Sequence, residues 1–207
     1  ESGNARTILG ARYNYSYADG DQWYQWSPDG KWFLVSYSPN SAFMNDAGLI
    51  SADGNGEVAN LTLSGYNDNR PKWMMDGEMM IWFTDRQGLR SHGSWGAQYD
   101  VYAMFFNQEA WDKFNLTEEE KKLFEDEEDE KDDREEDQGK KEDNEEKDVK
   151  PVEINLENIE DRKTRLTIHS SSLADALITP DGKKLYYLSR FEKGHDLWMK
   201  DLVKNET

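Results

Sequence analysis

The chain has 207 residues, no cysteine and a formal net charge of −18. The lack of cysteine excludes disulfides, thiol catalysis and Cys-type zinc sites, and it fits the cytosol and the periplasm alike. The acidity is concentrated between residues 118 and 148, where 31 residues include 19 acids and 7 bases. Without a basic stripe, the chain is not expected to bind nucleic acid, and no apolar run approaches the roughly 18 residues of a membrane span.

The N-terminal third contains signals for a strand meander. The alternation from Arg12 to Tyr17 predicts a strand, and residues 22–26 and 31–38 predict a hairpin. Pro28 sets φ for the first corner of its turn, and Gly30 tolerates the positive φ that closes it. Apolar side chains on both faces of the second hairpin strand predict that it lies between two layers. Two further strands are predicted at residues 46–52 and 57–62.

This hairpin recurs twice, at residues 72–82 and 178–187. Asp29 and Asp76, which occupy the same place in the first two turns, are 47 residues apart, a spacing typical of a four-stranded propeller blade. Asp76 and Asp181 are 105 residues apart, which exceeds that period by 58. Later strands of the two repeats are predicted at residues 98–106, 163–168 and 196–202.

Residues 108–150 interrupt the second repeat. Apolar side chains after Gln108 have loosely helical spacing, and Thr117 with Glu120 forms a plausible capping box. We expect a helix over the first third of the acidic run and a solvated or disordered remainder, because like charges dominate there. β structure is expected to resume at residues 152–156. The extra 58 residues match this insertion plus a lengthened loop at residues 86–96, which places the insertion between the third and fourth strands of one unit.

The predicted fold is therefore all-β, a partial β-propeller of about three four-stranded antiparallel blades with a partly helical acidic insertion. Closed propellers have four to eight blades, so we expect an open arc with uncovered apolar faces and strand edges, prone to self-association. Because the chain opens at Glu1 without a start Met, it is interpreted as a piece of a longer protein. The predicted limits are 18–65 for blade one, 66–107 and 151–170 for blade two, 108–150 for the insertion, and 171–207 for an incomplete blade three.

Two stretches resemble known families. The hairpins Trp26-Ser27-Pro28-Asp29-Gly30-Lys31 and Thr179-Pro180-Asp181-Gly182-Lys183, each followed by an apolar strand, are similar to the repeats of TolB-type β-propellers. The stretch Val152-Glu153-Ile154-Asn155-Leu156-Glu157-Asn158-Ile159-Glu160-Asp161-Arg162, with Arg165-Leu166-Thr167, resembles the second propeller of tricorn-like proteases. Those are serine peptidases of the tail-specific type, with two propellers ahead of their catalytic domains.

The second resemblance implies a non-catalytic propeller segment that filters or guides peptides or unfolded polypeptides to a catalytic domain outside this chain. No position matches the family's catalytic residues, so no catalytic, cofactor or metal residue is assigned. Two alternatives stay open: a TolB-like module for protein interaction, and the propeller of a prolyl-oligopeptidase-type hydrolase. The sequence that follows Thr207 in the parent protein would separate the three.

The chain has three histidines, His92, His169 and His195, and none is accompanied by a nucleophile motif. All three are interpreted as surface residues beside strands or in loops. Two acidic turns, Asp53 to Glu57 and Asp19 to Asp21, have alternating oxygen ligands but lack the twelve-residue EF-hand pattern. We interpret them as β-turns rather than calcium sites.

The aromatic residues have two interpretations. Large aromatics in repeats usually fill the space between blades, which is the favoured interpretation for Trp26, Trp32, Trp73, Trp82 and Trp198. Loop residues that could instead face a central channel and contact peptide are Arg86, Arg90, Tyr99 and Arg190. The acidic run is interpreted as a solvated insertion rather than a site for cations or a basic partner.

Overall fold

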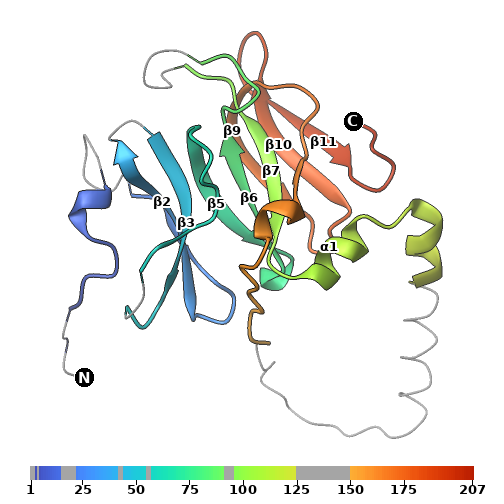
Figure 1. Cartoon of the computed structure of the whole chain (residues 1–207). Helices are drawn as coiled ribbons and strands as arrows, with labels where there is room; N and C mark the ends of the chain where they lie inside the picture. Colours follow the sequence, from blue (N-terminus) through green and yellow to red (C-terminus); the bar gives the residue numbers. More distant parts are fainter. Residues whose placement is uncertain are drawn as a thin grey trace, which may run out of the picture.

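The computed structural model describes residues 3, 5–14, 22–41, 44–54, 57–90, 96–124 and 150–207. Their strands form three antiparallel sheets arranged in an arc (Figure 1), which confirms the predicted all-β partial propeller. Sheet one contains β1 (Tyr24–Trp26), β2 (Trp32–Ser41), β3 (Met44–Ser51) and β4 (Ala59–Asn60). Sheet two contains β5 (Asp68–Met74), β6 (Met79–Thr84), β7 (Asp100–Phe105) and β8 (Lys163–Arg165). Sheet three contains β9 (Ser172–Ile178), β10 (Lys184–Arg190) and β11 (Asp196–Asp201).

The hairpin turn of sheet one is held by a hydroxyl, and that arrangement recurs in sheet three. Ser27 Oγ accepts from the Trp32 amide at 3.0 Å and donates to the Asp29 carboxylate. Thr179 Oγ1 accepts from the Lys184 amide, also at 3.0 Å, and donates to Asp181. Both turns close on a glycine at φ +68°, Gly30 and Gly182, where other residues are strained. The repeated sequence therefore forms the same turn twice.

The middle copy of the turn differs because Met74 occupies the place of the hydroxyl residue. There the chain forms a short 3₁₀ turn, η2 (Met75–Gly77), in which Met75 and Asp76 both have φ +50°. Gly77 has φ +99°, and a Cβ built on it would lie 2.5 Å from Val152 Cγ2. Glycine is thus required here both by the backbone conformation and by the close approach of the chain after the acidic run.

The outer strands of sheets one and two also repeat a side-chain bond. Thr62 Oγ1 accepts from the Ala47 amide at 3.1 Å, and Thr167 Oγ1 accepts from the Val101 amide at 3.2 Å. Both threonines follow a short outer strand, β4 or β8. The chain therefore leaves each sheet in the same way.

Asp100 stabilises this part of sheet two. It is fully buried at the start of β7, and its carboxylate accepts from Arg165, Thr167 and Ser170. A buried carboxylate is tolerated only when it is paired and hydrogen-bonded, and Asp100 has both kinds of partner. The loop between β8 and β9 is held against sheet two in this way.

The core consists of two layers of side chains, one on each side of sheet two. Between sheets one and two, Leu34 and Leu49 pack against Trp82 and Met80. Between sheets two and three, residues such as Ile81 pack with the apolar side chains of β9 and β10. All residues of β6 and β7 are buried. Sheet two is thus covered on both faces, which explains its nearly continuous apolar sequence.

The outward faces of the terminal sheets differ from each other. On sheet three, Leu177, Leu197 and Met199 are 49%, 68% and 41% exposed. On sheet one, a small cluster including Val35 and Tyr37 is covered by Ile8, Leu9 and Tyr13 from the N-terminal segment. The expectation of uncovered apolar faces is therefore met fully at sheet three and partly at sheet one.

Helical structure begins directly after β7. Helix α1 (Gln108–Phe114) is capped by Asn107, whose side chain accepts from the Ala110 amide. The predicted capping box is present, because Thr117 and Glu120 exchange side chain–backbone bonds, and residues 118–124 are helical. The rest of the acidic run lies outside the described residues. No helix in the described ranges is long and apolar enough to cross a membrane.

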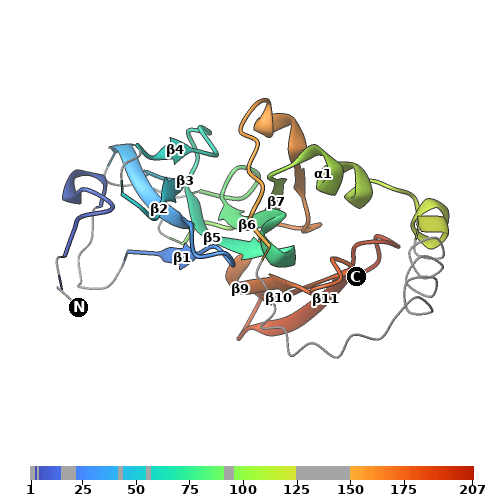
Figure 2. The same ribbon diagram turned by 90° about the horizontal axis from the view of Figure 1, so that it is seen from below.

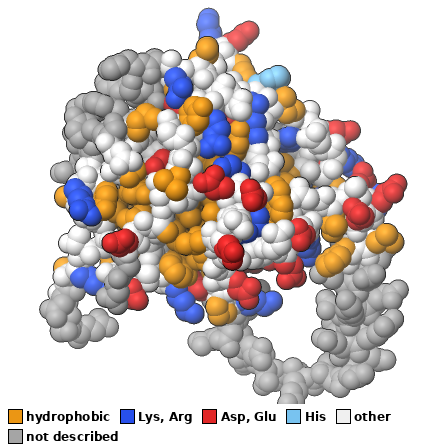
Figure 3. Space-filling model, viewed as in Figure 1, with side chains coloured by type: hydrophobic (Ala, Val, Ile, Leu, Met, Phe, Trp, Pro, Cys, Tyr) orange, Lys and Arg blue, Asp and Glu red, His pale blue; other side chains and the backbone are white. Residues whose placement is uncertain are grey.

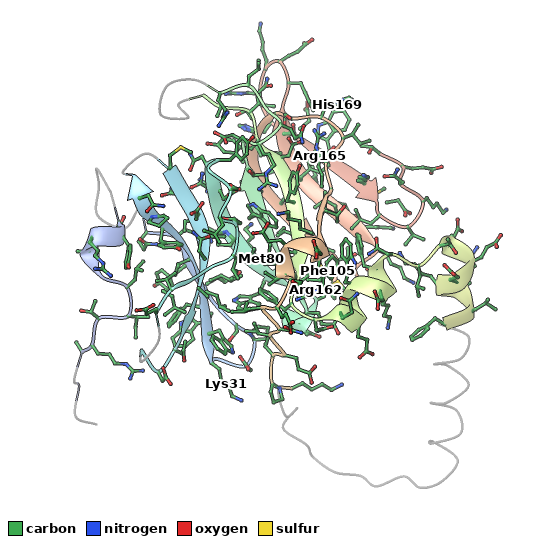
Figure 4. All side chains as sticks on the ribbon, viewed as in Figure 1. Lys31, Met80, Phe105, Arg162, Arg165 and His169 are labelled. Atoms are coloured by element: carbon green, nitrogen blue, oxygen red, sulfur yellow. The ribbon has the colours of Figure 1, made fainter. Side chains whose placement is uncertain are left out.

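The chain after the acidic run is anchored by one buried arginine. Arg162, in η4 (Ile159–Arg162), is only 4% exposed and donates to the backbone carbonyls of Asn155, Glu157 and Phe105. Figure 4 shows it beside Phe105 in the middle sheet. From there the chain enters β8, which pairs with β7 in the register Tyr102 to Arg165. The fourth strand of sheet two therefore comes from beyond the acidic run.

Two predicted strands are wrong. Residues 152–156 form no strand, because their backbone bonds go to single partners such as Asn155 N to Phe106 O and not to a ladder. Near the N-terminus, Ala11 to Tyr13 form a 3₁₀ turn, η1, instead of a strand. Here Tyr13 packs edge-on against Tyr37, so tertiary packing overrides the alternating pattern. Residues 15–17 of that prediction lie outside the described residues.

Replacing Arg162 with methionine tests its anchoring role. Methionine keeps an apolar stem but leaves three carbonyls without their donor, so Arg162→Met is expected to lower the free energy of unfolding by about 3 kcal/mol or more. Arg190→Met, at the exposed end of β10, is the matched control and is expected to cost less than about 0.5 kcal/mol. Urea denaturation measures both. Equal losses would contradict the anchoring role of Arg162.

Asp29 provides a second test, because it uses both carboxylate oxygens as acceptors. Oδ1 accepts from Lys31 N, and Oδ2 accepts from Val152 N at 2.9 Å. Burial alone would raise the pKa of Asp29, but the bonds from Ser27 and Val152 outweigh it and lower the pKa below 3.8. An asparagine has one acceptor oxygen, so Asp29→Asn is expected to cost about 1 kcal/mol at pH 7.

Asp181→Asn is the matched control, since only one oxygen of Asp181 is used as an acceptor. It is expected to cost less than Asp29→Asn in the same denaturation experiment. Because the folded pKa of Asp29 is depressed, its contribution is present above 3.8 and is lost as the pH falls through the folded pKa. The difference between wild type and Asp29→Asn should shrink over that range, and a difference independent of pH would contradict the assignment.

Candidate functional site

The inner strands of the three sheets are linked to one another by side chain–backbone bonds. Between β1 and β5, Trp73 N donates to Gln25 Oε1 at 2.8 Å, and Trp23 Nε1 donates to Pro71 O at 2.9 Å. Figure 2 shows β1, β5 and β9 together on the inner side of the arc. The strands present a common surface, which we call the inner-strand face and define by Trp23, Arg70, Lys72 and Asp175.

Two basic side chains of β5 extend the linkage to β9. Arg70 Nη1 donates to Ala174 O at 2.9 Å, and Lys72 Nζ donates to Ala176 O at 3.0 Å. Lys72 also forms an ion pair with Asp175. Burial alone would raise the pKa of the Asp175 carboxyl, but the bond and the charge of Lys72 outweigh it and lower that pKa. The Asp175 carboxyl therefore stays ionised at neutral pH.

Both cations lie near the ring of Trp23. The Arg70 guanidinium and the Lys72 ammonium are each 5.9 Å from the centre of its ring system, within the range of cation–π attraction. Trp23 is half-buried. The indole offers a flat apolar surface to a ligand, and the Arg70 guanidinium near it offers hydrogen-bond donors.

A hollow of about 510 Å³ opens beside this group. It is lined by side chains from all three sheets, including Trp23, Asn45, Arg70, Phe83, Tyr99 and Leu173. The amide groups are held in place, since Asn45 Nδ2 donates to Asn69 Oδ1 at 2.8 Å. Burial, followed by the charge of Asp85, raises the pKa of Tyr99, so its phenol stays protonated at neutral pH. A partly apolar hollow with a few fixed polar groups is the usual form of a ligand site.

Arg70 has a strained backbone at the edge of the hollow. Its φ is +53°, and the register of β5 against β6 shifts between Asn69 and Lys72. The Arg70 amide is turned to Ser36 Oγ, from which it is 2.9 Å away. A non-glycine residue in this region costs of order 1 kcal/mol, and such residues cluster at functional sites. We take the strain as a reason to place the site here.

Only one of the four predicted channel residues lines the hollow, namely Tyr99. Arg86 and Arg90 both lie over the ring of Tyr66, at 5.4 and 4.7 Å. Arg190 lies at the end of β10, where it approaches Ser172. Sequence reasoning missed Trp23, directly before β1, and Arg70, in β5. They occupy equivalent positions of the first two repeats, six residues before Asp29 and Asp76.

The predicted tryptophan positions are correct in part. Trp73 and Trp82 are buried between sheets one and two, with Trp32 packed against the same cluster. Trp26 is instead 52% exposed on the outward face of sheet one, where its ring centre lies 3.9 Å from that of Phe33 with the two rings tilted by 44°. Trp198 is 38% exposed beside Phe191. Trp73 and Trp82 are covered by the neighbouring sheet, whereas the described residues form no sheet over Trp26.

His169, His195 and Asp53 are not among the residues that line the hollow. His169 and His195 are exposed, and Figure 4 shows His169 at the edge of the molecule near Arg165. His92, Asn55, Gly56 and the turn at residues 19–21 lie outside the described residues. Asp53 accepts a bond from Ser51. The described part of the chain has no group of three or more His, Asp or Glu side chains arranged to hold a metal.

Figure 3 shows one face of the molecule, on which the lysine and arginine side chains of the described residues are interspersed with acidic and apolar ones. Lys72 is paired with Asp175. The Arg70 guanidinium and the fixed amides of Asn45 and Asn69 are suited to bind carbonyl and carboxylate oxygens.

Comparison with known proteins supports the fold. No protein-family model and no curated protein sequence matches the chain. Among solved structures, the chain is similar to TolB from Acinetobacter baumannii (16% identity, 89% of this chain and 31% of that one, TM-score 0.49). It is also similar to a putative TolB from Agrobacterium tumefaciens (14% identity, 94% and 47%, TM-score 0.48). The tricorn protease gives 8% identity over 88% of this chain and 17% of that one, with a TM-score of 0.52.

The chain spans less than half the length of each of these structures. At such low identities the similarity shows the fold alone, and the argument rests on the tricorn protease, whose TM-score exceeds 0.5. Together with the three sheets it establishes a β-propeller module.

Proposed function

We propose that this chain is a non-catalytic propeller segment of a tricorn-like serine protease. In this role it guides peptides or unfolded polypeptides to a catalytic domain outside the chain. The observation that carries the proposal is the inner-strand face beside its hollow, where Arg70 and Lys72 both lie near the ring of Trp23. The likeness of the stretch from Val152 to Arg162 to tricorn-like propellers supports the choice of parent.

The chemistry of this face suits an extended peptide. A guanidinium carries five N–H donors, and Arg70 uses Nη1 on Ala174 O, which leaves other donors for peptide carbonyls or a terminal carboxylate. The Trp23 ring supplies apolar contact that depends little on the sequence of the peptide. Such contacts are weak and unselective, as a surface requires when it passes many substrates onward.

We further propose that the three sheets are blades with limits 18–65, 66–107 plus 151–170, and 171–207, and that residues 108–150 are an insertion in blade two. The pairing of β7 with β8 across the acidic run supports this division.

Peptide binding is tested with an unstructured 15-residue peptide that carries a fluorophore and a free C-terminal carboxylate. Arg70→Gln removes the charge and is expected to weaken binding about five- to tenfold, the effect of one charge-assisted hydrogen bond. Arg12→Gln, at an exposed position in η1, is the matched control and should bind like wild type. Fluorescence anisotropy measures both, with thermal unfolding as a check on the fold. Equal binding by wild type and Arg70→Gln would contradict the role of this face.

The chain itself is expected not to hydrolyse peptides. Purified protein incubated with casein and with short fluorogenic peptides should give no cleavage above a heat-treated sample. Cleavage that survives purification and disappears in His92→Ala, His169→Ala or His195→Ala would overturn the non-catalytic assignment. Peptide binding without cleavage would agree with the non-catalytic assignment.

A further inference from the structure

Two arginines in the loop between β6 and β7 (Figure 1) lie over the ring of one tyrosine, Tyr66. The guanidinium carbon of Arg86 lies 5.4 Å from the centre of that ring and 5.5 Å from the centre of the Tyr102 ring. The guanidinium carbon of Arg90 lies 4.7 Å from the centre of the Tyr66 ring. Two positive charges are therefore gathered at one aromatic side chain, an arrangement that an anion would stabilise.

These guanidinium groups have hydrogen-bond donors to offer. Among the residues that the structure describes, neither Arg86 nor Arg90 has a hydrogen-bond acceptor or an ion-pair partner, and the Nε atom of Arg86 is buried. The other buried side-chain atom without a partner in that part of the chain is Oγ1 of Thr84, at the end of β6. Buried donors are normally paired, with water or an ion where the protein supplies no acceptor. The acceptor for Arg86 Nε is therefore expected to come from outside the chain.

The buried carboxylates at this end of sheet two have donors of their own. Asp85 accepts from the Asn67 amide at 3.0 Å, and Asp68 accepts from Trp82 Nε1 at 2.9 Å. No ion pair joins these carboxylates to either guanidinium in the described part of the chain. The positive charge of the two arginines is thus directed to a ligand and not to a neighbouring acid.

Hydrogen bonds and burial hold this group in place. The amide of the residue after Tyr66 donates to the carboxylate of the residue before Arg86. The carbonyl of the residue before Arg90 accepts from Gln98 N at 2.8 Å, which joins the two limbs of the loop. Tyr102 is only 7% exposed. A site that is held in this way gains affinity, because little conformational freedom is lost when a ligand binds.

We propose that Arg86 and Arg90, together with Tyr66, bind a phosphate group. A guanidinium carries five N–H donors in a planar fork that matches the oxygens of carboxylates and phosphates. One fork satisfies a carboxylate, whereas a phosphate monoester carries about 1.5 to 2 negative charges at pH 7 and three oxygens that two forks can share. Two cations at one ring therefore favour the phosphate. None of the three residues lines the hollow beside the inner-strand face, so this inference does not rest on the proposed peptide site.

The test is a titration of the 207-residue chain with sodium phosphate, at constant ionic strength so that screening does not change. The arginine Nε–H resonances are followed by NMR, and Arg86→Lys assigns the Arg86 resonance by its loss. That resonance is expected to shift and to saturate. Arg90→Gln removes one of the two charges at an exposed position and is expected to weaken phosphate binding about tenfold, the effect of one charge-assisted hydrogen bond.

Arg12→Gln is the matched control. The Arg12 guanidinium also lies over a tyrosine ring, 4.5 Å from its centre, but it already donates to the hydroxyl of that tyrosine. This variant should bind phosphate like wild type. Arg70→Gln should do so as well, because Arg70 belongs to the proposed peptide site, and the two sites can then be lost independently of each other.

A phosphoserine peptide and its unphosphorylated form distinguish the two sources of a phosphate group. Tighter binding of the phosphopeptide than of free phosphate would identify an ester as the ligand, and equal affinity would identify free phosphate. Sodium acetate, with one charge, is expected to bind at least about tenfold more weakly than phosphate. Lack of saturation up to about 50 mM phosphate, equal affinity for acetate, or unchanged binding by Arg90→Gln would overturn the proposal.

Discussion

Burial of both faces of sheet two is the constraint on which the rest of the structure depends. β6 and β7 are buried at every position, and a sheet with two apolar faces needs a layer on each side. Sheet one supplies one layer and sheet three the other. The repeat along the sequence follows from this need, because each hairpin forms one layer and no single layer can cover itself.

The same constraint explains how a long acidic run is tolerated within one sheet. The strands on either side, β7 and β8, are joined by a ladder and by the Asp100 network, and Arg162 fixes the returning chain to three carbonyls. The chain therefore leaves sheet two after β7 and re-enters it at β8 through fixed points. The two side chains that fix the chain at these points, Asp100 and Arg162, are both deeply buried. On the inner side, the linked strands β1, β5 and β9 leave Trp23 and Arg70 at the surface.

The pattern of Asp-Gly turns and apolar strands predicted the three sheets. It could do so because the conformation of each turn and the buried face of each strand are determined by residues close together in the sequence. Short outer strands were predicted less well: β4 has two residues, and residues 152–156 form none. Their backbone partners lie far away in sequence, as in the bond from Asn155 to Phe106. The candidate site escaped prediction for the same reason, since Arg70 meets Trp23 and Ala174 only after three sheets have packed. Tyr99 was found because it lies at the start of a recognisable strand.

The central claim is that sheet two is completed by a strand from beyond the acidic run. Nuclear Overhauser effects between the α protons of facing residues in an antiparallel ladder report this pairing directly in solution. The account predicts such contacts for Tyr102 with Arg165 and for Met104 with Lys163, the register of β7 and β8. Strong contacts of residues 163–165 with any other strand, or their absence alongside intact contacts between β6 and β7, would contradict it.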